Sequence, residues 1–85
     1  MALPRKVGGM VDETPDELVQ RCIRAAGEGA DFPTVWETVL RGHALVVGPP
    51  LQAVEGGRIC LKILILTGQW LVFDSASREF SLRRR

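Results

Sequence analysis

The sequence has few of the residues on which metal sites, disulfide frameworks and cofactor loops depend. Its 85 residues include two cysteines, one histidine and no tyrosine. Two cysteines cannot build a disulfide scaffold, and Cys22, Cys60 and His43 lack the paired spacing of a zinc site. The glycines match neither of the common phosphate-binding patterns. We therefore expect no metal and no cofactor.

The chain has almost equal numbers of acidic and basic residues, little lysine and no asparagine. The formal net charge is +1, so the chain as a whole has no general attraction for nucleic acid or membranes. Nine of the eleven basic residues are arginine, and asparagine is absent. Lysine, asparagine and tyrosine share AT-rich codons, which indicates a GC-rich, bacterial genome.

No segment of the sequence is apolar over the length of a membrane span. Residues 59–73 are the most apolar segment, but they are too few to cross a bilayer and are interrupted by Lys62 and Gly68. Residues 1–11 contain no apolar stretch of the length that a secretory signal needs. We therefore expect a cytoplasmic protein with reduced thiols, in which residues 1–11 form a flexible leader and residues 12–85 form a single domain.

Two helices are predicted in the first half of the chain. Thr14, Pro15 and Glu17 form a capping box with proline at the first helical position, and an apolar stripe at helical spacing continues to Ala26. A second, shorter helix follows a start signal at residues 31–34, in which either Asp31 or Thr34 can be the cap. Glycines follow both helices.

The sequence pattern of the second half predicts β-strands. We expect strands over residues 44–47, 58–66, 70–74 and 79–83, separated by glycine-, proline- and serine-containing turns. Pro49 and Pro50 place the first strand at a sheet edge, because proline cannot donate a ladder hydrogen bond. The predicted fold is therefore α+β, with two N-terminal helices packed on a four-stranded antiparallel meander whose 58–66 and 70–74 strands are central.

The two central strands are apolar on both faces. Two short helices can cover one face of a four-stranded sheet, so the other face needs a second cover. The apolar residues that we expect on this second surface are Leu64, Leu66, Trp70, Leu71 and Phe73, although the face on which Trp70 lies is not determined by the sequence. We expect them to be buried in a homo-oligomer, and the alternatives are a hetero-partner, the N-terminal leader, or a single chain whose core packs differently.

The function that follows is a non-catalytic protein-interaction or assembly module that works as a homodimer. One alternative is a nucleic-acid-binding accessory protein, which would use the C-terminal Arg83, Arg84 and Arg85. A less favoured alternative is a small enzyme around His43 with Cys22 or Cys60, although no spacing marks these residues as a catalytic set.

Overall fold

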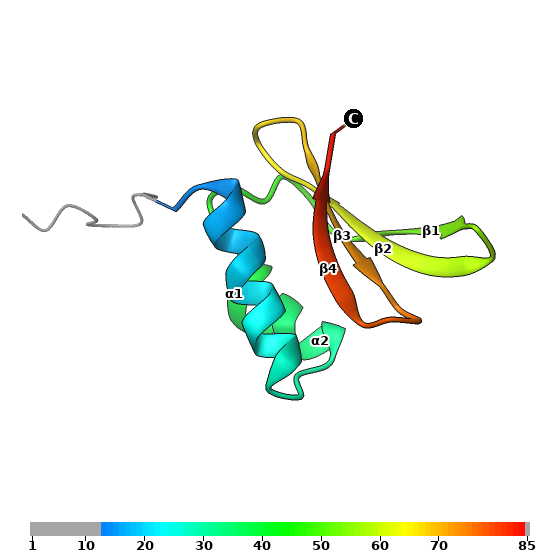
Figure 1. Cartoon of the computed structure of the whole chain (residues 1–85). Helices are drawn as coiled ribbons and strands as arrows, with labels where there is room; N and C mark the ends of the chain where they lie inside the picture. The colour runs from blue at the N-terminus through cyan, green and yellow to red at the C-terminus, as the bar shows by residue number, and fades with distance from the viewer. Residues whose placement is uncertain (1–12, 85) are drawn as a thin grey trace, which may run out of the picture.

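The computed structural model describes residues 13–84, which form two helical segments packed on a four-stranded antiparallel sheet (Figure 1). The strands lie side by side in the order β1-β2-β3-β4, so the fold class and the central position of β2 and β3 are confirmed. The elements in chain order are α1 Pro15–Gly27, α2 Phe32–Val35, the π-helix η2 Trp36–Leu40, β1 Leu51–Glu55, β2 Arg58–Leu64, β3 Trp70–Asp74 and β4 Glu79–Arg83. The predicted leader at residues 1–11 lies outside the described residues.

Helix α1 begins at the predicted capping box. The Thr14 hydroxyl accepts a hydrogen bond from the Glu17 amide at 3.1 Å, and the Glu17 carboxylate accepts one from the Thr14 amide at 2.9 Å. Pro15 occupies the first turn, where its missing N–H has no helical partner to lose. The chain leaves the helix through Gly29, whose φ of 103° suits glycine.

The second helical segment is capped by Asp31 rather than Thr34. The Asp31 carboxylate accepts a hydrogen bond from the Thr34 amide at 3.0 Å, which decides between the two caps. The α-helical turn of α2 then widens into the five-residue π-helix η2. The Thr38 hydroxyl donates to the Thr34 carbonyl at this transition, and Gly42, with a φ of 80°, follows the helical end.

The first strand does not lie where the sequence predicts it, which corrects the expectation for residues 44–47. That segment forms only an isolated bridge, in which Val46 faces Ile65. Pro49 and Pro50, which lack N–H groups, end the pairing, and the regular strand β1 starts only after them. The two-residue turn at Gly56 and Gly57, both at positive φ, then joins β1 directly to β2.

The helices cover one face of the sheet and form the main core with it. Ile63, Leu71, Phe73 and Phe80 point from the strands toward the helices. Phe73 lies between Phe32 and Phe80, with ring centroids 5.3 and 4.8 Å apart. The buried residues contributed to this core by the helical segments are Leu18, Val19, Cys22, Val35 and Leu40.

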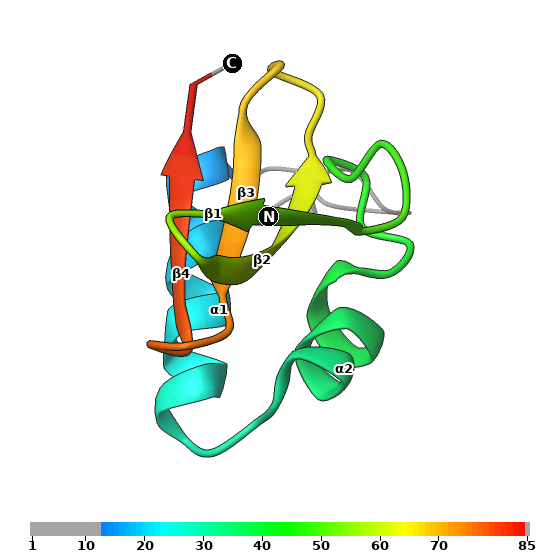
Figure 2. The same ribbon diagram turned by 90° about the vertical axis from the view of Figure 1, so that its right-hand side faces the viewer.

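The chain itself covers part of the opposite face, because the sheet is strongly coiled. In a flat sheet β1 and β4 would be about 14 Å apart, yet Glu55 at the end of β1 contacts Arg83 at the end of β4 at 2.5 Å. Figure 2 shows β1 crossing in front of β2 and β3, on the side away from the helices. On the face that this hairpin encloses, Cys60 of β2 and Val72 of β3 are only 2% and 1% exposed. A second copy is therefore not needed to bury them.

Candidate interaction surfaces

Two of the five predicted interface residues belong to the core of the single chain. Leu71 pairs with Ile63 and Phe73 pairs with Leu61, which places both on the helix-covered face. Their exposed fractions are 1% and 6%. Strands that are apolar on both faces do not show which face the helices cover, so the predicted set combines residues from both faces. Leu71 and Phe73 are not part of the surface of the folded chain.

The other three predicted residues lie on or beside the opposite face and remain at least partly accessible. Leu64 pairs with Trp70, and both are half-buried. Leu66 is 66% exposed, and its amide donates to the Leu45 carbonyl at 2.8 Å. Lys62 lies over the Trp70 ring, with Nζ 5.3 Å from the ring centroid, and shields part of it.

Two further apolar residues, which the sequence did not single out, extend this surface. The Val47 amide donates to the Leu64 carbonyl at 2.9 Å, and Leu51 pairs with Lys62. Both side chains are more than half exposed. We call Val47, Leu51, Leu64, Leu66 and Trp70 the apolar patch. Val47 and Leu51 lie on either side of Gly48-Pro49-Pro50. Apolar residues next to a turn of this kind are the only sequence feature that could have indicated an exposed surface here.

His43 has a structural role in which both ring nitrogens are occupied. Its Nδ1 accepts a hydrogen bond from the Leu45 amide at 3.0 Å, so the ring proton is on Nε2 and donates to Glu13 at 2.9 Å. Arg21 donates twice to the same carboxylate, at 2.8 and 3.1 Å, and this pairing is the main reason why the pKa of Glu13 is lowered. The three side chains tie the start of α1 to the loop after η2.

The two cysteines are buried as free thiols, far from the environment of a reactive nucleophile. Burial raises the pKa of Cys22 to about 12, so this thiol stays protonated at neutral pH. Cys60 lies in β2, on the other face of the sheet, which the coiled β1–β2 hairpin encloses. Within residues 13–84 there is also no cluster of three histidine, cysteine or acidic side chains that could hold a metal ion.

The C-terminal arginines are not equally available to a ligand. Arg83 donates through Nη1 to Glu55, and Lys62 donates to the other oxygen of that carboxylate at 3.2 Å. Both contacts lower the pKa of Glu55, with Arg83 the larger cause. Arg84 is exposed, and Arg85 lies outside the described residues. The structure thus places one of the three predicted nucleic-acid-binding residues in an internal ion pair.

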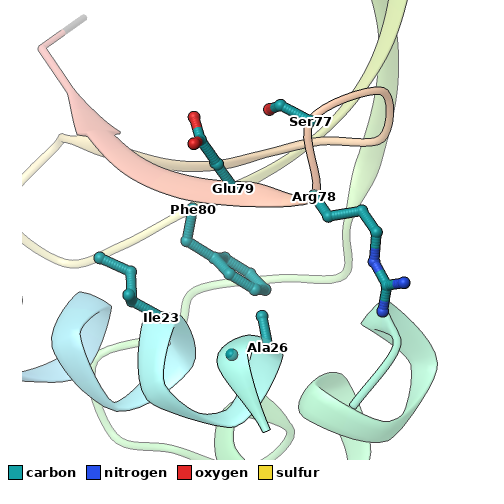
Figure 3. A pocket seen from close by; sticks show the side chains of 7 residues that line it. Ile23, Ala26, Ser77, Arg78, Glu79 and Phe80 are labelled. Carbon is teal, nitrogen blue, oxygen red and sulfur yellow. The ribbon is translucent and has the colours of Figure 1, made fainter. Parts of the chain in front are cut away.

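A hollow of about 530 Å³ opens between the end of α1 and the start of β4 (Figure 3). Ile23 and Ala26 of the helix and Phe80 of the strand form its apolar part. Ser77, Arg78 and Glu79 form its polar rim. Arg78 has a φ of 63° and points toward the Ala30 carbonyl, so the backbone turns away from the strand direction just before β4.

Comparisons with known proteins add no relative. No protein-family model, no curated protein and no solved structure matches this chain. Among the described residues, no helix has the length and apolar character needed to cross a membrane. The candidate sites therefore depend on the geometry of the chain alone.

Proposed function

We propose that this chain is a small, non-catalytic protein-interaction module of the bacterial cytoplasm that works as a homodimer and binds a partner protein through the apolar patch. The supporting observation is the exposure of Val47, Leu51 and Leu66 beside a core that is already complete. Contiguous exposed apolar side chains on a small domain are typical of binding surfaces. The patch also includes Leu64, Leu66 and Trp70, which the sequence predicts as interface residues and which remain at least partly accessible.

The chemistry of the other candidates favours binding over catalysis. His43 uses one ring nitrogen for a backbone amide and the other for Glu13. The Cys22 thiol is held protonated by its raised pKa. A small enzyme around His43 would need a nucleophile and a base with free hydrogen-bonding positions, so the observed contacts count against this alternative.

The nucleic-acid alternative has less support because Arg83 forms an ion pair with Glu55 of its own chain. A few arginines give a weak and salt-sensitive hold on phosphates. Retention of the protein on random duplex DNA at about 50 mM and about 200 mM salt tests this alternative, because binding through phosphates weakens strongly over this range. We expect no retention at either salt concentration, and salt-dependent retention lost on deletion of residues 83–85 would favour the nucleic-acid function instead.

Site-specific photo-crosslinking tests the binding surface in the native host. A photoreactive residue at position 66 should give discrete adducts with a partner protein, whereas the same residue at position 37, on the exposed side of η2, should not. Light scattering across a concentration range tests the homodimer against the chain mass of 9.4 kDa. Equal adduct patterns at both positions would contradict the assignment of the patch, and a chain that stays at 9.4 kDa would contradict the homodimer.

A further inference from the structure

Strand β4 is an open edge of the sheet. In Figure 2 it lies at the outer side of the sheet, next to β3, and no other strand of residues 13–84 pairs with its outer edge. It contains five residues without proline, and the left-handed backbone of Arg78 marks its beginning. An edge of this kind presents a row of main-chain hydrogen-bonding groups to any chain that can pair with it.

The hydrogen-bond pattern shows which groups of β4 point outward. The Ser75 amide donates to the Ile59 carbonyl and the Ile65 amide donates to the Gln69 carbonyl, so the odd-numbered residues of β3 face β2. The even-numbered residues of β3 therefore face β4, where Trp70 pairs with Arg83 and Val72 with Ser81. This leaves the N–H and C=O groups of Phe80 and Leu82 directed away from the sheet.

The sequence of β4 is complementary to itself when it is read in the opposite direction. Glu79-Phe80-Ser81-Leu82-Arg83 has an acid at one end, a base at the other, and two apolar residues around a central serine. We propose that two copies of this chain dimerise by antiparallel pairing of β4 with β4, with the two-fold axis at Ser81. The inference builds on the homodimer of the proposed function and gives it a specific interface.

This register satisfies charge, apolar and main-chain groups together. Glu79 of each copy lies opposite Arg83 of the other, and Phe80 lies opposite Leu82 of the other. Arg83 donates to Glu55 of its own chain through Nη1, so its other guanidinium N–H groups are the ones that meet Glu79 of the second copy. The outward main-chain groups of Phe80 and Leu82 then bond reciprocally across the axis. A shift of the axis by one residue, to Phe80 or Leu82, retains matching sheet faces but separates both Glu79–Arg83 pairs.

The hollow beside β4 accommodates the same arrangement. In this register the second copy's Leu82 stands next to Phe80 on the helix-covered face, where Ile23 and Ala26 line the hollow (Figure 3). Ile23 is 41% exposed on the single chain, so the hollow has an uncovered apolar wall. Helix α1 runs antiparallel to β4 in Figure 1, and the two-fold axis makes the two copies of α1 antiparallel to each other. The acidic first turn of one then lies toward the end of the other that carries Arg24.

The size of this interface predicts a weak dimer. A five-residue strand pair with the adjoining helix surface buries roughly 500–700 Å² per copy, slightly below the area of a standard stable interface. We expect a dissociation constant on the order of micromolar, so measurements should extend from about 1 to 500 µM.

Charge reversal tests the pairing. Glu79→Arg places arginine opposite Arg83 of the second copy, and Arg83→Glu places two acids opposite each other, so each variant alone should dimerise at least tenfold more weakly than the wild type. An equimolar mixture of the two variants restores both opposite-charge pairs and should form a heterodimer. Gln52→Arg on the other edge strand, β1, is the control and should leave dimerisation unchanged.

A cysteine at the two-fold axis gives a second test that does not require Arg83→Glu to fold. The Cα atoms of the two Ser81 residues should be about 4.5 Å apart, because they form a non-hydrogen-bonded pair, and this distance suits a disulfide. Under mild oxidation Ser81→Cys should therefore form a disulfide-linked dimer, whereas Gln52→Cys should not. The native thiols are buried and should not compete.

The outcomes separate this inference from the proposed function. If the wild type scatters as a 9.4 kDa chain up to 500 µM, both the homodimer and its β4 interface are refuted. If the wild type dimerises but Glu79→Arg and Ser81→Cys behave as their controls do, only the β4 interface is refuted. Dissociation by Leu66→Asp would then place the dimer at the apolar patch instead.

Discussion

Replacement of Gly57 should open the β1–β2 hairpin and expose Cys60 without unfolding the rest of the chain. Gly57 has a φ of 77° in the two-residue turn between β1 and β2. Valine at this position must adopt the left-handed conformation, which costs about 1–2 kcal/mol. Gly57→Val should therefore raise the population of the open hairpin by about 5- to 30-fold.

The exposure of Cys60 reports this opening. Cys60 is 2% exposed on the enclosed face of the hairpin, where it pairs with Ala53 of β1. In a Cys22→Ser background, Cys60 is the single thiol, and its rate of reaction with an aromatic disulfide reagent should rise by the same 5- to 30-fold factor. The assay is a stopped-flow or manual absorbance measurement at several reagent concentrations, combined with urea unfolding of the same samples.

The control is Gly48→Ala, since Gly48 is not at positive φ and a Cβ there meets no atom within 4 Å. This variant should react at the rate of the parent. If Gly57→Val lowers the free energy of unfolding but leaves the thiol rate unchanged, the hairpin is not what covers Cys60. The account of a sheet face shielded by its own chain would then be wrong.

Three further predictions concern the helix cap, the Glu13 carboxylate and the two faces of the sheet. Thr14→Ala removes the hydroxyl that caps α1 and should cost about 1 kcal/mol, seen as a melting temperature lower by roughly 4–8 °C. Arg21 holds the pKa of Glu13 below its ordinary value of 4.5, so the stability from this pair is present above pH 4.5 and declines as the pH falls through the lower folded-state pKa. Urea unfolding between pH 3 and 6 should show this decline, and Glu13→Gln should reduce it; an identical pH profile in the variant would contradict the pairing. Leu71→Asp should unfold the chain, because it buries a carboxylate in the core, whereas Leu66→Asp should retain the wild-type circular dichroism spectrum and melting temperature. Equal melting temperatures for these two variants would contradict the assignment of the faces.

The elements with strong local signals could be predicted from the sequence. The start of α1 follows from Thr14, Pro15 and Glu17 because their interactions involve only near neighbours in the chain. The β3–β4 hairpin was likewise predicted by its apolar strands and the intervening turn. The prediction of a strand at residues 44–47 is wrong, although the β-branched residues there have a high β propensity. Whether they form a ladder depends on the prolines that follow and on pairing with residues distant in the sequence.

The candidate sites were less predictable, since they depend on which face the helices cover. Alternation separates Leu64 from Leu71 only when the register between β2 and β3 is known, and the sequence alone does not determine it. The coverage of Cys60 and Val72 was missed for a related reason. It results from coiling of the sheet, which brings Glu55 to Arg83, and coiling is a property of all four strands together.

The contact between α1 and β4 joins the first helix of the described chain to its last strand. The strands pair with their sequence neighbours, so most of the sheet can form early from short loops. The apolar stripe of α1, however, has Phe80 and Leu82 among its packing partners. During synthesis the part of this helix that packs on β4 stays exposed until residues 79–83 have left the ribosome, so folding of the domain is completed only after translation of β4.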